Sequence, residues 1–183
     1  MSALLHGPAL WYATRATGLV TLLLLTASVL LGILTTGRFA GGSWPRFLTV
    51  GLLRNLSLLT AVFLALHVAT NVIDTFVSIP LTAAFIPFAS SYKPFWLSLG
   101  AVALDLLIAL VATSLIRNRL GLRAWRRVHW AAYACWPIAL AHGLGIGTDR
   151  KTIWVFALTL ACAAAVAATV TWRFVSTARP GAR

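Results

Sequence analysis

The chain has 183 residues, of which 60% are hydrophobic and only 10% are charged, and its mean hydropathy is +0.90. Soluble globular domains carry about 25% charged residues, so this composition excludes that class and indicates a membrane protein. The net charge of +12 does not indicate a nucleic-acid partner, because the basic residues lie at or near the ends of apolar runs.

Five apolar runs are long enough to cross a hydrocarbon core of about 30 Å, which takes about 20 helical residues. The sequence therefore predicts an all-α, polytopic membrane helix bundle, multi-pass in the cell (plasma or inner) membrane, that forms one domain over residues 1–183. The expected helices cover residues 10–35, 51–77, 94–116, 128–146 and 153–175. The first run has the length of a span, so we expect no cleavable signal peptide.

The basic residues set the expected orientation. With five spans the two termini lie on opposite sides, and placing the C-terminus inside puts 11 of the 15 basic residues on the inner side. Cytoplasmic loops are enriched in Lys and Arg, so we expect an N-out, C-in topology with lipid contacts at both surfaces. The four expected on the outer side are Arg15, Lys93, Arg150 and Lys151.

The second run carries a polar stripe on one face. At about 100° per residue, its polar side chains fall within an arc of roughly 100°. A polar stripe on a spanning helix is expected to face other helices or something bound between them, since lipid offers no hydrogen-bond partners. The stripe consists of Ser57, Thr60, His67, Asn71 and Asp74.

The segment between the second and third runs is apolar but interrupted by Pro80 and Pro87. We expect it to lie at the membrane interface, where it either covers helix ends or roofs a cofactor or docks a partner. The third run carries Asp105 near its middle, where an acid is costly unless it is protonated or paired. A role in helix contacts and a role in proton handling both remain open for Asp105.

The fourth run holds two histidines. His142 lies four residues before Ile146, and His67 lies six residues before Ile73, where the continuous apolar stretch of the second run ends, so both are expected at similar depth. Two neutral imidazoles on neighbouring helices are the ligands of a six-coordinate b-type haem, although either can also be a simple helix contact. His129 lies 13 residues before His142, about 20 Å along a helix and roughly 140° around it, where a second haem iron could bind. Neither Cys135 nor Cys162 belongs to a CxxC motif, so covalent haem attachment is not expected.

Three segments carry a family resemblance: RATGLV at 15–20, LRNLSLLTAVFLALHV at 53–68 and WRRVHWAAYACWPIALAHGLG at 125–145. Their pattern of histidines resembles the ferric reductase-like transmembrane domain family, which includes the membrane halves of ferric reductases and NADPH oxidases and the MsrQ-type bacterial haem proteins. The resemblance implies that His67 and His142 bind an outer haem iron and that His129 corresponds to a ligand of an inner haem. It also implies a flavoprotein partner carrying FMN or FAD.

One position departs from the family pattern. The inner ligand of the second run would stand at residue 53, which is Leu53 here, so only the outer haem has both ligands. Basic side chains at the inner side, Arg54, Arg126 and Arg127, are candidates for haem propionates or a flavin phosphate, and Arg15 and Asn71 are candidates near the outer haem.

The sequence therefore predicts a membrane b-type cytochrome, an electron-transfer component of a ferric reductase-like oxidoreductase. It would pass electrons to an acceptor at the outer face, with a separate flavoprotein or membrane quinol as its partner. The alternative is a non-redox membrane subunit or a small proton or metal transporter that uses His67, His142 and Asp105.

Overall fold

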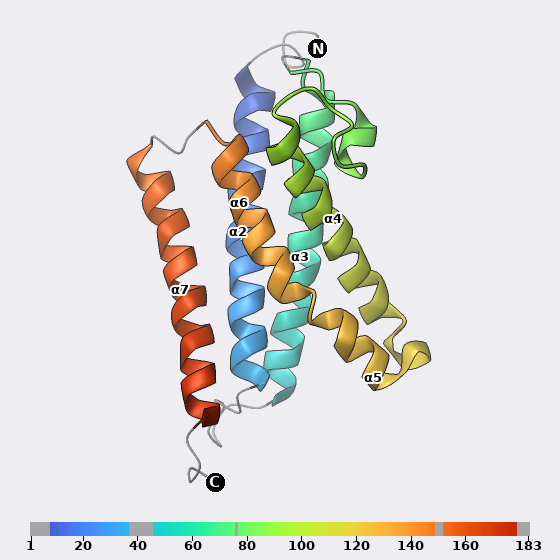
Figure 1. The fold of residues 1–183 in the computed structure, drawn as a ribbon, viewed down its shortest axis with the longest axis vertical. Coiled ribbons are helices and arrows are strands. Elements are labelled where there is room, and N and C mark those ends of the chain that lie inside the picture. Colours follow the sequence, from blue (N-terminus) through green and yellow to red (C-terminus); the bar gives the residue numbers. More distant parts are fainter. Residues whose placement is uncertain (1–7, 37–45, 76, 149–151, 179–183) are drawn as a thin grey trace. The chain divides into compact units, whose positions relative to one another are not determined.

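The computed structural model describes residues 8–36, 46–75, 77–148 and 152–178, and these residues form helices and no strand. The predicted all-α class is therefore confirmed (Figure 1). The elements are α2 (Pro8–Thr36), α3 (Arg46–Ile73), the 3₁₀ helix η1 (Leu81–Ala84), α4 (Pro94–Leu115), α5 (Arg117–His129), α6 (Ala132–Ile146) and α7 (Ile153–Ala178).

Four of these helices are long and apolar enough to cross a membrane, as expected for a multi-pass membrane protein. The candidate spans are Ala9–Thr35, Phe47–Ile73, Pro94–Leu115 and Ile153–Ser176. The fifth expected span, 128–146, differs from the prediction. The chain turns at residues 130 and 131, and α6 begins only at Ala132. At 15 residues α6 is roughly 22 Å long, which is shorter than the hydrocarbon core.

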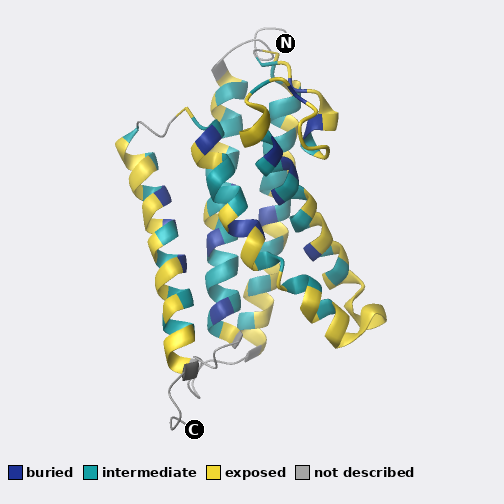
Figure 2. Cartoon of the chain, viewed as in Figure 1, coloured by how far each residue is buried: buried dark blue, intermediate teal, exposed yellow. Residues whose placement is uncertain are grey.

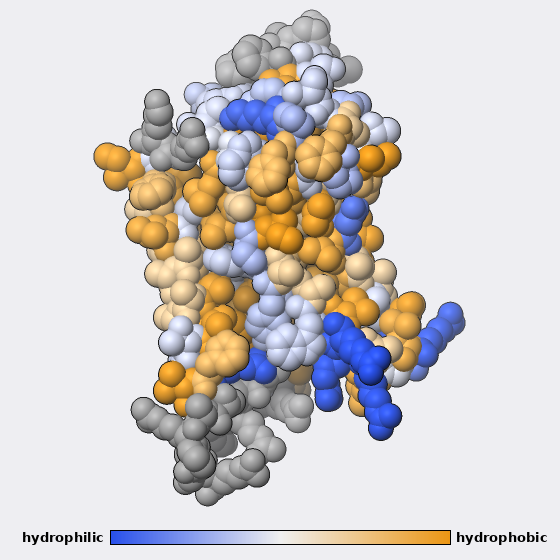
Figure 3. Space-filling view, viewed as in Figure 1, coloured by the Kyte–Doolittle hydropathy of each residue, from blue (hydrophilic) through white to orange (hydrophobic). Residues whose placement is uncertain are grey.

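The residues before that turn form α5, a separate basic helix. Its 13 residues include five arginines and no acidic residue, with polar and apolar side chains on different faces. Gly121 has a φ of 74°, a conformation that favours glycine, and it divides the helix into two parts. Figure 3 shows hydrophilic side chains gathered over α5, whereas apolar side chains dominate the surface of the longer helices. A helix with this many arginines does not enter the hydrocarbon core cheaply, which explains why it is separate from α6.

The chain divides into two compact units, of which the first comprises residues up to Leu22 and Ala61–Thr148. Within it α4 and α6 pack along each other. Small side chains at this contact are buried, and the Cys135 thiol donates to the Ala103 carbonyl oxygen at 3.5 Å (Figure 2). Small residues allow helices to approach closely, which is how membrane helices gain packing energy.

The segment between α3 and α4 packs against the beginning of α4. Ile79, Ala83 and Ser90 are buried, and the backbone N–H of Phe88 donates to the Ser98 hydroxyl at 2.7 Å. The Phe88 side chain is exposed. The segment therefore covers a helix end, and its exposed aromatic side chains leave a docking role as a prediction.

The second unit comprises Leu23–Thr60 and Asp149–Arg183, so it contains the remaining parts of α2 and α3 together with α7. Ile33 and Thr60 are each 1% exposed, whereas Leu58 is 50% exposed. The Thr60 hydroxyl donates to the Leu56 carbonyl one turn earlier. Because this hydrogen bond satisfies the hydroxyl, Thr60 can be buried among apolar side chains. The polar stripe of α3 thus lies on the less exposed side of the helix, as its sequence predicts.

Replacing Ile33 by Ala should leave a cavity and lower the stability of the protein by about 2–5 kcal/mol. The matched control is Leu58→Ala, which removes the same number of carbons from an exposed position and should change stability little. Thermal unfolding in one detergent compares the two variants. Equal loss of stability in both would contradict the assignment of Ile33 to the interior.

Candidate functional site

Two histidines from different helices meet in the first unit. His67 of α3 and His142 of α6 have ring centroids 6.5 Å apart, and their ring planes are nearly perpendicular, at 85°. Neither side chain is exposed. The structure thus brings together the two imidazoles that the sequence placed at matching depth.

Each of these rings is held by a backbone carbonyl of a neighbouring helix. The Nδ1 atom of His67 lies 2.8 Å from the Thr14 carbonyl oxygen in α2, and the Nδ1 atom of His142 lies 2.8 Å from the Trp96 carbonyl oxygen in α4. A carbonyl oxygen only accepts, so Nδ1 carries the proton and donates in both rings. In a neutral imidazole the other nitrogen, Nε2, then has a free lone pair. Both histidines therefore present an unprotonated Nε2.

A glycine lies against each ring. A Cβ added to Gly18 would lie 2.9 Å from Cε1 of His67, and one added to Gly100 would lie 2.5 Å from Cε1 of His142. Gly18 follows Thr14 by four residues, and Gly100 follows Trp96 by four. In an α-helix these positions are stacked, so a side chain there would stand between the ring and the carbonyl. The missing Cβ is what lets each imidazole reach its acceptor.

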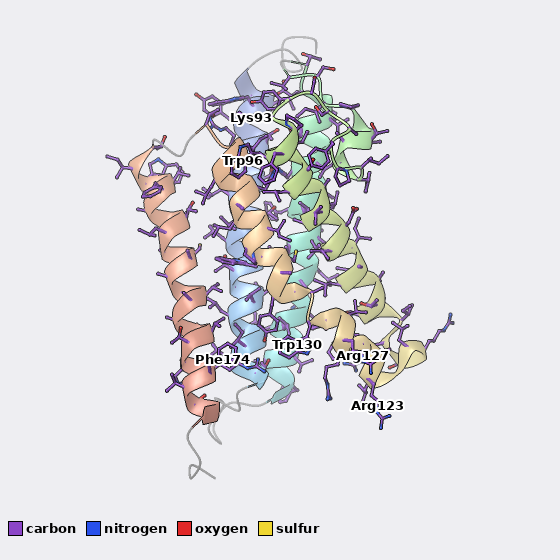
Figure 4. The ribbon with its side chains drawn as sticks, viewed as in Figure 1. Lys93, Trp96, Arg123, Arg127, Trp130 and Phe174 are labelled. Carbon is purple, nitrogen blue, oxygen red and sulfur yellow. The ribbon has the colours of Figure 1, made fainter. Side chains whose placement is uncertain are left out.

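Polar and aromatic groups surround the same end of this unit. The Arg15 guanidinium lies 3.8 Å from the Trp11 ring centroid and donates to the Thr148 hydroxyl. The Lys93 ammonium donates to the Gly145 and Ile146 carbonyl oxygens at 3.4 and 3.3 Å. These carbonyls belong to the last turn of α6, whose acceptors have no partner within the helix. Figure 4 shows Lys93 and Trp96 at the beginning of α4. Sequence reasoning did not assign Lys93 to the site.

One buried hydroxyl beside His67 has no partner. Oγ1 of Thr14 is buried without a hydrogen bond among the described residues, although the Thr14 carbonyl holds His67. Buried polar atoms are nearly always paired in folded proteins, so this hydroxyl is a candidate contact for a water molecule or a bound group. Asn71, predicted to help bind a cofactor, is half-buried one turn after His67.

His129, the third candidate ligand, lies in a different setting. Its ring stacks on Trp125 with centroids 4.5 Å apart, and its Nδ1 atom is buried without a hydrogen-bond partner in the described ranges. Burial lowers the pKa of His129, which favours the neutral ring. Arg126 and Arg127 are exposed on α5. Arg54 is exposed on α3 in the second unit.

The described residues hold no group of three or more His, Cys, Asp or Glu side chains that could bind a metal ion. A structural zinc site takes four protein ligands and a catalytic one three, whereas the histidine pair supplies two. Asp105 lies on the exposed side of α4, roughly 140° around the helix from Gly100, which touches His142.

No known protein family, curated protein or solved structure matches the chain.

Gly18→Ala and Gly100→Ala should each push an imidazole away from its carbonyl. Forcing a methyl group into these contacts should lower stability by about 1–3 kcal/mol. Gly32→Ala on α2 and Gly143→Ala on α6 are matched controls, because a Cβ at either position meets no atom within 4 Å. Thermal unfolding compares the four variants. Equal stability of all four would contradict the close contact of glycine and imidazole.

Proposed function

We propose that this chain is a membrane b-type cytochrome that binds one haem b between His67 and His142 and transfers electrons. The observation that carries the proposal is the pair of enclosed imidazoles, 6.5 Å apart, each with Nδ1 engaged by a backbone carbonyl. Both rings then offer Nε2 to the same metal.

The separation of the rings fits two ligands on opposite sides of one metal. An imidazole nitrogen binds a first-row metal at about 2.0 Å and lies about 1.2 Å from its own ring centroid, so two such rings have centroids about 6.4 Å apart. The observed separation of 6.5 Å agrees with this value. Edge-to-face packing of two rings also spans this distance, so the proposal rests on the separation together with the engagement of both Nδ1 atoms by carbonyls.

The number of protein ligands also favours haem. A porphyrin supplies four equatorial nitrogens, so its iron needs only two axial ligands from the protein. The described residues offer a pair rather than a group of three or more, as this chemistry requires. When bound, the haem supplies reversible one-electron oxidation and reduction of iron.

The chain's own residues orient the two imidazoles. The Thr14 and Trp96 carbonyls fix the tautomer and the rotation of the two imidazoles, and a hydrogen bond of this kind also raises ligand basicity. Arg15, through its charge, and the Thr14 hydroxyl, which has no hydrogen-bond partner among the described residues, are groups that could bind a propionate.

The number of haems follows from residue 53. Burial lowers the pKa of His129, which favours the neutral ring that a ligand needs, but residue 53 is Leu53, so no histidine completes a second pair. We therefore propose one six-coordinate haem. A second haem at His129 would need a ligand that the family pattern does not provide.

The electron donor is proposed to be a separate protein or a membrane quinol. We also propose that α6, although shorter than the hydrocarbon core, completes a fifth crossing. The bias of basic residues then favours an N-out, C-in topology, in which His67 and His142 lie near the outer face and deliver electrons to an acceptor there. One haem near the outer surface leaves most of the hydrocarbon core, which is about 30 Å thick, without a cofactor that carries electrons across it. A flavoprotein with FMN or FAD, as the family resemblance implies, could dock at the exposed arginines of α5.

Purified protein should show a Soret band and sharp reduced α and β bands, and His67→Ala and His142→Ala should each abolish the low-spin spectrum. The reason is that either change removes one of two axial ligands. His6→Ala, which changes the one histidine outside the described residues, is the matched control and should keep the spectrum. An unchanged low-spin spectrum in either site variant would remove that residue from the ligand set.

The ring orientation makes a separate prediction. Perpendicular imidazole planes, here 85° apart, leave the two iron orbitals that interact with the rings nearly equal in energy. The oxidised protein should therefore give a strongly anisotropic low-spin electron paramagnetic resonance signal. A rhombic signal, typical of parallel imidazole planes, would contradict the observed ring geometry.

A further inference from the structure

Asp105 lies at the centre of a membrane span and faces outward. It is midway between Pro94 and Leu115, the ends of the α4 span. Its side chain is exposed, and it forms no hydrogen bond or ion pair in the part of the chain that the structure describes. An acid within a membrane span is costly, and such residues almost always face a bundle interior, a water-filled cavity or a charged partner. None of these surrounds Asp105 within the first unit.

The residues around Asp105 form a face suited to a helix. Ile108, Ala109 and Ala112 follow at three, four and seven residues, so they lie on the same side of α4, and all three are exposed. The alanines have small side chains that allow another helix to approach closely. Ala103, whose carbonyl accepts from Cys135 of α6, is buried on the other side of α4. One turn before Asp105 on the same side, Ala101 is buried, so the exposed face begins at Asp105. We call the face formed by Asp105, Ile108, Ala109 and Ala112 the Asp105 face.

We propose that the Asp105 face binds a membrane-spanning helix of a different protein, one that carries an arginine or lysine at the depth of Asp105. The charge decides the kind of occupant. A carboxylate in the hydrocarbon core is stabilised by a cation that lies at the same depth and donates hydrogen bonds to it. Ala109 and Ala112 bring the two backbones close enough for the side chains to meet.

A second copy of this chain is not complementary to the face. Its lysines and arginines lie at or near the ends of the apolar runs, so it has no cation at the middle of a span. A symmetric dimer through this face would also place Asp105 opposite Asp105, because a two-fold interface uses the same patch twice. The proposal does not depend on haem binding, and it holds for any function of the chain.

The test uses two synthetic transmembrane peptides as probes, both leucine-rich, one with a central arginine and one with a central leucine. The full chain and each peptide are placed in phosphatidylcholine vesicles, and association is measured by energy transfer between fluorescent labels. The wild-type chain should bind the arginine peptide at least tenfold more tightly than the leucine peptide. Asp105→Asn, which keeps the shape and removes the charge, should abolish this preference.

Two further variants separate the face from the charge alone. Ala109→Leu keeps Asp105 but blocks close approach, and it should weaken binding of the arginine peptide severalfold. Leu160→Ala alters an exposed residue of α7 and should leave binding unchanged. All variants are first shown to keep the helical content of the wild type.

The proposal is overturned if the wild-type chain binds both peptides equally or if the preference survives in Asp105→Asn. Self-association of the chain that Asp105→Asn abolishes would assign the face to a second copy and would equally overturn it.

Discussion

The constraint on which the site depends is the contact between each imidazole and a helix that lacks a side chain at that point. His67 reaches the Thr14 carbonyl only because Gly18 has no Cβ, and His142 reaches the Trp96 carbonyl only because Gly100 has none. The two rings therefore depend on four helices, α2 and α3 for one and α4 and α6 for the other. Loss of packing between either pair would release one ring.

Much of the fold follows from the sequence because apolar length is a strong signal in a membrane. The four long spans and the inward direction of the polar stripe on α3 were predictable in this way. The fifth span was not placed correctly, since VHWAAYACWPIALAHGLGI reads as continuous while the chain turns at 130 and 131. The five arginines of α5 make it a separate amphipathic helix. Counting apolar residues does not reveal this break between α5 and α6.

The site was predictable only in part, for a physical reason. Depth along two helices can be counted in residues, and this places His67 and His142 at one level. What orients them is a backbone carbonyl, and every residue has one, so no side chain marks Thr14 or Trp96 as the acceptor. The only mark in the sequence is a glycine four residues after each acceptor, Gly18 and Gly100. This mark is not specific, because Gly32 also lies on α2 and a Cβ there would meet no atom within 4 Å. The hydrogen bond from Lys93 to the Gly145 carbonyl at the end of α6 was also not predictable, because it depends on how the loop before α4 places residue 93 beside residue 145.

The central proposal concerns what lies between the two imidazoles, and a density map answers that question most directly. The protein would be expressed with an ample haem supply, purified in lipid nanodiscs and imaged by electron cryo-microscopy with a bound antibody fragment. We predict planar density the size of a porphyrin, bound on opposite sides by Nε2 of His67 and of His142, with both Nδ1 atoms still on their carbonyls. Direct packing of the two rings against each other, with no density between them, would contradict the account.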